Sequence, residues 1–322
     1  MLIGKLFFNE FGRLRCGWRL LLFVLAFAAI SFLLASGLRI AYAFSLQLLP
    51  SIPHGAFVAN IIYRLTLVGS ALGAGYLCNR FLEGLPWRAL GLSFHDDWLR
   101  DLLIGSAIGI VSLAVAAGIA TAFGGLRFTA NGTGMLLQVG KTLLSSALLF
   151  IVAALAEEAM FRGYPLQTMA RANLVWLGVL LTSVPFATVH LWNPNVVPGV
   201  TFANTALAGM WLAIAYLRTR SLWFPLGVHW AWNWALGSIF GLPVSGMTLT
   251  SHPLLKGTDL GPAWLTGGSY GIEGGVACTI ALLLSSVFLW RTRLVSPTDE
   301  LKRLTSQENP AIPAAVPVRA MS

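Results

Sequence analysis

The stretch ALLFIVAALAEEAMFRG, residues 147–163, sets two neighbouring carboxylates directly after ten uncharged residues. The whole chain has 322 residues, of which 57% are hydrophobic and only 10% are charged. Ordinary soluble domains carry about 25% charged residues, and a soluble protein of this length needs more polar surface to cover its core. The composition therefore predicts an integral membrane protein.

Eight segments are apolar enough and long enough to cross the roughly 30 Å hydrocarbon core of a bilayer as helices. Lipid satisfies no backbone hydrogen bonds, so uniformly apolar segments of this length are expected to be helical. They cover residues 18–38, 57–79, 102–123, 138–161, 173–192, 199–217, 222–241 and 275–291. We expect an all-α, polytopic integral membrane protein with about eight transmembrane helices.

The basic residues predict the orientation of these helices. Of the 21 Lys and Arg residues, all but five fall in the tails and loops on one side of an eight-helix topology, or at the helix ends beside them. The positive-inside rule assigns that side, with both chain termini, to the cytoplasm. This bias, with attraction to anionic lipid headgroups, explains the net charge of +9, so the expected partner is the lipid bilayer and no nucleic acid. The five exceptions are Arg39, Arg64, Arg127, Lys141 and Lys256.

Embedded polar residues mark the candidate site. A charged group at the centre of a bilayer costs at least ~2.5–3.5 kcal/mol, so its presence there needs a reason. Of the 12 acidic residues, only Glu157 and Glu158 lie inside a predicted helix, and of the five histidines, His190 and His229 lie in the fifth and seventh predicted helices. These four side chains are therefore the first candidates for function.

Helical periodicity groups these residues with their neighbours. Residues four positions apart share a face, so Glu158 can form an ion pair with Arg162, and His229 can act together with Asn233. Glu157 is rotated about 100° from Glu158 and has no cation on its own face. Because a partner lowers the cost of burying a charge, Glu157 is the acid that is harder to explain structurally.

The chemistry of this set fits hydrolysis of a peptide bond. A carboxylate removed from water becomes a better general base, an imidazole can orient water, and the amide of Asn233 could stabilise an oxyanion. Glu157, His190 and His229 could instead hold a zinc ion with an open position for water. The chain contains no HExxH sequence, the commonest pattern of zinc proteases.

Other interpretations stay open. Each histidine, and Asn233, could be a hydrogen-bond partner between helices, and Glu158 with Arg162 could be a purely structural ion pair. A proton-coupled transporter could use Glu157 and Glu158 as its relay. A third interpretation is a non-catalytic membrane scaffold or immunity protein.

Three motifs resemble those of a known family. EEAMFRG at residues 157–163 matches its EExxxR motif, FATVH at 186–190 its FxxxH motif, and HWAWN at 229–233 its HxxxN motif. In order and approximate spacing they resemble the CPBP family of intramembrane proteases, which includes type II CAAX prenyl endopeptidases and lysostaphin-resistance-A-like and Abi proteins. The resemblance implies an intramembrane endopeptidase that acts on a peptide or protein substrate. It leaves metal dependence, and hence zinc, undecided.

The resemblance also implies a role for each matching residue. Glu157 is then the base that activates water, and His190 helps to hold that water or a metal. His229 and Asn233 face the substrate carbonyl as the oxyanion site. The supporting residues are Glu158 and Arg162.

Around the motifs we expect four parts: about three N-terminal transmembrane helices and loops at 1–137, the catalytic core at 138–238, an extracytoplasmic loop and the last helix at 239–293, and a polar, Pro-rich, disordered cytoplasmic tail at 294–322. The lack of eukaryotic targeting signals fits a bacterial inner membrane. We expect the cavity to open to the cytoplasm. If the fifth helix starts at Asn173, His190 lies at a different depth from Glu157. The site then closes only if the fourth helix continues towards Met169, or if the fifth helix starts deep or tilts strongly.

Overall fold

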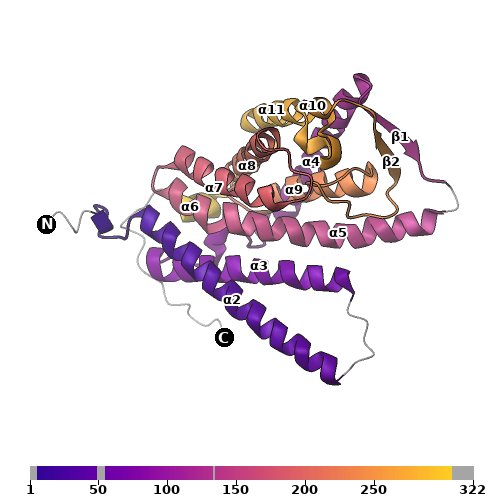
Figure 1. The fold of residues 1–322 in the computed structure, drawn as a ribbon. Coiled ribbons are helices and arrows are strands. Elements are labelled where there is room, and N and C mark those ends of the chain that lie inside the picture. The colour runs from indigo at the N-terminus through magenta and orange to yellow at the C-terminus, as the bar shows by residue number, and fades with distance from the viewer. Residues whose placement is uncertain (1–5, 49–54, 133–134, 307–322) are drawn as a thin grey trace.

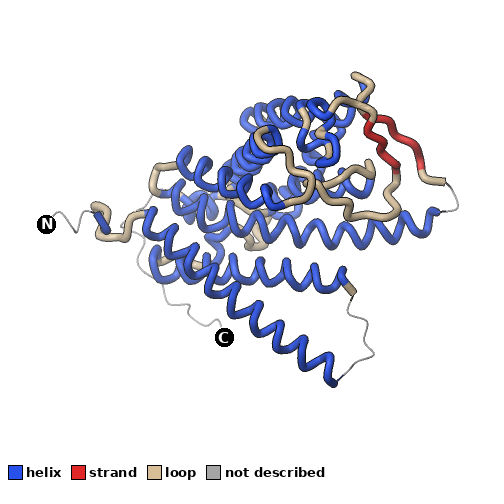
Figure 2. The backbone as a smooth tube through the Cα atoms, viewed as in Figure 1, coloured by secondary structure: helices blue, strands red, loops and turns tan. Residues whose placement is uncertain are grey.

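A computed structural model describes residues 6–48, 55–132 and 135–306 of the chain. Helices make up most of this part (Figure 1), and its one sheet consists of two short strands (Figure 2). Six of the described helices are long and apolar enough to cross a membrane. The predicted fold class, an all-α multi-pass membrane protein, is therefore confirmed.

The first six predicted segments correspond to long helices. These are α2 (Cys16–Leu48), α3 (Ala56–Cys78), α4 (Trp98–Ala122), α5 (Leu136–Glu158), α7 (Val175–Val189) and α8 (Val200–Thr219). All are runs of apolar residues, and only α7 contains a proline, Pro185. In Figure 1, α2 and α3 form a pair on one side of α5, and most of the later helices gather on its other side.

The seventh and eighth predicted segments form shorter helices. α9 (Trp223–Trp234) has 12 residues and continues into the π-helical turn η6 (Ala235–Ile239), and α11 (Val276–Arg291) has 16. A bilayer span needs about 20 residues, and apolar helices of about 10–14 are more often buried core helices. α9 packs against α4, α5 and α8, and most of its residues are buried. In the described residues, six helices instead of about eight have the length and composition of spans.

α9 packs directly on α4 through glycine residues. A Cβ atom on Gly109 of α4 would lie 2.2 Å from the carbonyl oxygen of Val228 in α9. A Cβ atom on Gly105 or Gly227 would meet the facing helix at 2.3 Å. Small residues let helix backbones touch in this way within a membrane. Because Val228 directly precedes His229, this contact fixes the position of that histidine.

The helix that carries the acidic pair continues beyond its expected end. α5 passes through the π-helical segment η4 (Ala159–Gly163) into α6 (Tyr164–Arg171), and the apolar segment Leu136–Arg171 has 36 residues. At a rise of 1.5 Å per residue this is roughly 50 Å, longer than the hydrocarbon core. Glu157 therefore lies well inside the span, which meets the condition for bringing it to the depth of His190.

A buried ionic cluster attaches the α2–α3 pair to α6. Glu83, at the end of the π-helical turn η1 (Asn79–Glu83), accepts hydrogen bonds from Thr168 at 2.6 Å and from Arg171. Arg19 of α2 lies 3.6 Å from the same carboxylate. The acid and both arginines are buried, and each opposite charge lowers the cost of burying the other. The cluster therefore connects three separate parts of the chain.

The strands β1 (Leu126–Ala130) and β2 (Leu255–Asp259) pair antiparallel, with Leu126 opposite Asp259. They join the segment after α4 to the segment before α11. The remaining short elements are η2 (Trp87–Leu90), η5 (His190–Trp192), α10 (Ala263–Thr266), η7 (Gly268–Tyr270), η8 (Ile272–Gly274) and α12 (Asp299–Thr305).

α12 lies in the region expected to be a disordered tail. Thr298 caps this helix by accepting a hydrogen bond from the Leu301 backbone N–H. Leu301 is buried, and α12 contacts α6 and η2. Part of the expected tail is thus a helix packed on the protein, because it has a cap and an apolar residue to bury. Residues 307–322 lie outside the described residues.

We predict that Gly109→Ala destabilises the protein, because the added methyl group meets the backbone of α9. Overpacking of this kind costs about 1–3 kcal/mol. Gly118→Ala is the matched control, since nothing lies within 4 Å of its Cβ position on the same helix and alanine favours a helix by roughly 1 kcal/mol over glycine. The thermal unfolding midpoint in detergent should fall only for the first variant. Equal midpoints would contradict the close α4–α9 contact.

Candidate active site

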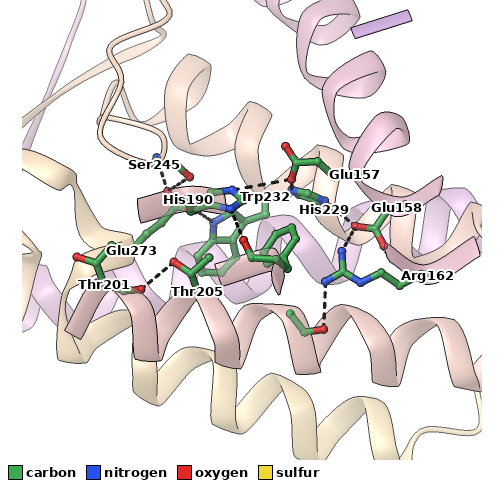
Figure 3. A network of polar contacts seen from close by, with 12 residues as sticks. Glu157, Glu158, Arg162, His190, Thr201, Thr205, His229, Trp232, Ser245 and Glu273 are labelled. Carbon is green, nitrogen blue, oxygen red and sulfur yellow. Dashed lines mark hydrogen bonds and ion pairs between the residues drawn. The ribbon is translucent and has the colours of Figure 1, made fainter. Parts of the chain in front are cut away.

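Glu158 is the buried centre of the motif residues (Figure 3). Its Oε1 atom accepts hydrogen bonds from Arg162 Nη1 at 3.0 Å and from His229 Nδ1 at 2.8 Å, and its side chain is 0% exposed. Arg162 also donates through Nη2 to the Gly209 carbonyl at 3.1 Å. The ion pair expected from the four-residue spacing is present. It is extended by a histidine 71 residues away, which the spacing could not reveal.

Glu157 faces the other nitrogen of the same imidazole. Its Oε2 atom lies 3.7 Å from His229 Nε2 and 4.0 Å from His190 Nε2. Glu157 has no cationic partner in its own helix, but two histidines from elsewhere in the chain lie beside it. Consecutive carboxylates about 100° apart can meet one imidazole because its two nitrogens lie on different edges of the ring. The Glu157 side chain is 25% exposed, so it is the acid of the pair that reaches open space.

His190 directly follows α7 and begins η5. Its Nδ1 atom donates a hydrogen bond to the Phe186 carbonyl at 2.7 Å. The Phe186 ring centre lies 4.5 Å from the guanidinium carbon of Arg162 and 4.6 Å from the centre of the His190 ring. The first of these is within range of a cation–π contact. Phe186 therefore joins the buried ion pair to His190, which explains the aromatic residue in FATVH.

The hydrogen bonds of the two histidines indicate which nitrogen carries the proton. In each ring the partner of Nδ1 is an acceptor, the Phe186 carbonyl or the Glu158 carboxylate, so Nδ1 carries hydrogen. In the neutral rings both Nε2 atoms are then acceptors, and they face the Glu157 carboxylate, a third acceptor. Three acceptors cannot hydrogen-bond to one another. The arrangement is therefore suited to a donor between them, such as a water molecule.

Glu157 and both histidines line one cavity of 360 Å³, a size typical of small-molecule and peptide sites. Asn233, one helical turn after His229, lines it as well and is partly exposed. Much of the wall is apolar, and this part includes Phe27, Leu67, Phe150, Met160, Trp211 and Leu282. The structure thus brings all four candidate catalytic residues to the same space.

A further acid, Glu273 of η8, lines the cavity. Its Oε1 atom accepts a hydrogen bond from Trp232 Nε1 at 3.1 Å, and its Oε2 atom accepts one from the Ser245 N–H at 2.6 Å. Trp232 lies between His229 and Asn233 in α9, so Glu273 holds the following loop against the helix that carries both. Sequence reasoning missed this role. The only signal was a single acid between glycines in a segment otherwise free of charge.

The loop between α9 and α11 forms one end of the cavity, through Ser245, Met247 and Tyr270. The distribution of basic residues assigns this loop to the extracytoplasmic side. The opening of the cavity to the cytoplasm stays a prediction. Burial and, secondarily, the charge of Glu273 raise the pKa of Tyr270 to about 12. Its hydroxyl therefore keeps its proton at neutral pH.

The candidate zinc ligands Glu157, His190 and His229 do not form a zinc site as they are arranged. Ligand atoms around a tetrahedral zinc with bonds of about 2.0–2.1 Å lie about 3.3–3.4 Å apart. Here the two separations from Glu157 are 3.7 and 4.0 Å. Within the described ranges, no group of three His, Cys, Asp or Glu side chains is placed to hold a metal ion. The chemistry derived below uses side chains and water alone.

Residues 139–235 match the family model described as type II CAAX prenyl endopeptidase Rce1-like. The chain carries a domain of that family. The matched segment contains EEAMFRG, FATVH and HWAWN and confirms the family that these motifs indicated. No curated protein matches the chain.

In the Rce1-like domain, Glu158→Gln should strongly reduce stability, because Arg162 is left buried without an acid. Breaking one side of a buried ion pair costs about 3–5 kcal/mol. Glu300→Gln is the matched control, since its 3.0 Å ion pair with Arg88 is partly exposed and such pairs contribute about 0–1 kcal/mol. Thermal unfolding in detergent should show a large loss for Glu158→Gln alone. Similar midpoints for the two variants would argue against a central role for Glu158.

Proposed function

We propose that the protein is an intramembrane endopeptidase that cleaves a peptide or protein substrate with a water molecule activated by Glu157. One observation carries the proposal: the partly exposed Glu157 carboxylate faces Nε2 of both His190 and His229 at the wall of a cavity among apolar helices. The Rce1-like domain supports a peptidase of the CAAX-protease type. The cavity has the size and the apolar wall to receive a short peptide segment.

In this mechanism Glu157 takes one proton from water while the water oxygen attacks the carbonyl carbon of the scissile bond. His190 accepts a hydrogen bond from the other hydrogen of the water and so orients the attack. When the C–N bond breaks, Glu157 gives its proton to the nitrogen of the leaving amine. The carboxylate is regenerated, and one water molecule has been added across the peptide bond.

Asn233 is the proposed donor to the oxyanion that forms on the substrate carbonyl. A neutral His229 has no hydrogen on Nε2 to donate, because its Nδ1 hydrogen is bonded to Glu158. We therefore assign the oxyanion site to Asn233, and we place His229 with Glu157 on the water. This differs from the role inferred from the motifs, in which His229 and Asn233 share the oxyanion.

The buried position of Glu158 argues against a proton relay through both acids. Its side chain is 0% exposed, and its Oε1 atom already accepts hydrogen bonds from Arg162 and His229. A proton on Glu158 would weaken its attraction to a buried guanidinium, which is costly. The structure therefore favours a fixed charge at Glu158 and proton transfer at Glu157 alone.

The several apolar helices and the protease family indicate a multi-pass membrane protein. We propose a bacterial inner membrane as its location. The biological roles that fit are processing of a leader peptide, bacteriocin immunity and turnover of membrane proteins. The apolar part of the cavity wall suits an apolar or membrane-bound peptide substrate.

Glu157→Gln should abolish cleavage while the protein stays folded, because the amide cannot accept a proton. Loss of a general base lowers rates about 10²–10⁴-fold. Mass spectrometry of the peptides released from membranes that contain the wild type or the variant measures this loss, and it also identifies substrates. Glu10→Gln, at an exposed position near the N-terminus, should release the same peptides as the wild type. An unchanged release rate in folded Glu157→Gln would rule out the proposed mechanism.

Cleavage should persist in the presence of a zinc chelator, because Glu157 lies too far from His190 and His229 for the three to hold the metal. The measurement is the initial rate of release of a substrate peptide before and after treatment with 1,10-phenanthroline. Glu157→Gln provides the background rate. A loss of activity that added zinc restores would show instead that Glu157, His190 and His229 move together around an ion.

A further inference from the structure

Arg64 is a charged residue within a transmembrane helix that the proposed mechanism does not use. It lies in α3, and its side chain lines the cavity that also contains Glu157. A charge at the centre of a bilayer costs at least ~2.5–3.5 kcal/mol, and an ionisable residue in a span generally marks a functional site. The cavity gives this charge a space in which to bind a ligand.

Arg64 has no acidic partner in the described part of the chain. Its Nε atom donates a hydrogen bond to the neutral Asn60 side chain at 2.8 Å. Arg162, by contrast, is both buried and paired with Glu158 at 3.0 Å. The two terminal nitrogens of Arg64 form no hydrogen bond or ion pair with any described residue. They are therefore available to an anion that enters the cavity.

We propose that Arg64 binds a carboxylate of the substrate peptide. The inference rests on the proposed function, because it requires a peptide in the cavity. A guanidinium group offers two parallel N–H donors that match the two oxygens of a carboxylate, and such charge-assisted bonds are roughly twice as strong as neutral ones. Arg64 is then a specificity-determining residue that recognises a charge away from the bond that is cut.

A second charge in the cavity favours one orientation of the peptide. Glu273 lines the same cavity from the segment before α11. In Figure 1 this segment and α3 lie on opposite sides of α5, the helix that carries Glu157. A substrate carboxylate is attracted at the α3 wall and repelled at the other wall. Arg64 and Glu273 together therefore select the direction in which the peptide crosses Glu157.

The test measures binding of synthetic peptides to the purified full-length protein in detergent. The first pair shares one short fluorescent sequence of Ala, Leu and Val and ends in a free carboxylate or in an amide. The second pair is amidated and carries an internal Asp or Asn, which separates a side-chain carboxylate from a terminal one. Binding is measured by fluorescence anisotropy in the Glu157→Gln background, so that no peptide is consumed.

With Arg64 present, the carboxylate form of at least one pair should bind about tenfold more tightly than its amide partner. Arg64→Gln should remove this preference, and Arg64→Lys should restore part of it, because lysine keeps the charge without the planar fork. Arg39→Gln is the matched control, since Arg39 is exposed on α2 and does not line the cavity. Thermal midpoints verify that each variant is folded.

Three results would overturn the inference. They are equal affinities within both peptide pairs, no binding by any peptide, and an unchanged carboxylate preference in folded Arg64→Gln. Binding of an anionic lipid to Arg64 in place of the peptide would also overturn it. In that case phosphatidylglycerol would co-purify with the wild type but not with Arg64→Gln, and the peptide preference would be the same in both proteins. The two proposals fail separately. Wild-type cleavage with no Arg64-dependent preference removes only this inference, and Arg64-dependent binding without wild-type cleavage removes only the proposed function.

Discussion

The candidate site depends on the contacts that the Glu158 carboxylate makes with Arg162 and His229. A buried guanidinium costs several kcal/mol unless an acid accompanies it, and Glu158 neutralises Arg162 while it also accepts the Nδ1 hydrogen of His229. That second bond fixes the tautomer of the histidine and turns Nε2 towards Glu157. The two adjacent acids therefore have different roles. Buried Glu158 binds both Arg162 and His229, and partly exposed Glu157 faces the cavity.

Local rules predicted the local parts of this arrangement. The positions of the long helices follow from runs of apolar residues, and the Glu158–Arg162 pair follows from a spacing of four residues within one helix. The environment of Glu157 could not be predicted in this way, because His190 and His229 come from other helices and only packing brings them together. That packing depends on contacts such as Gly109 against the backbone of α9, which no pattern within one helix reveals.

Hydropathy does not distinguish burial in lipid from burial in protein. It measures preference for leaving water, and most residues of α9 are buried against other helices, so its hydropathy alone did not reveal this packing. Glu273 is the converse case. An acid between two apolar segments is normally assigned to solvent, yet the loop after α9 folds back over the cavity and binds its carboxylate through Ser245, while Trp232 binds it from the helix.

The short helix α11 has a consequence for the surrounding lipid. Its 16 residues extend roughly 24 Å at 1.5 Å per residue, less than the thickness of the hydrocarbon core, and Leu284, Val287 and Phe288 are exposed on its surface. Acyl chains that border so short an apolar wall relieve the mismatch by local thinning of the bilayer. A thinner bilayer shortens the path from the aqueous phase to the interior of the helix bundle. If the protein acts as proposed, one short helix therefore brings the aqueous phase closer to the water that hydrolysis consumes.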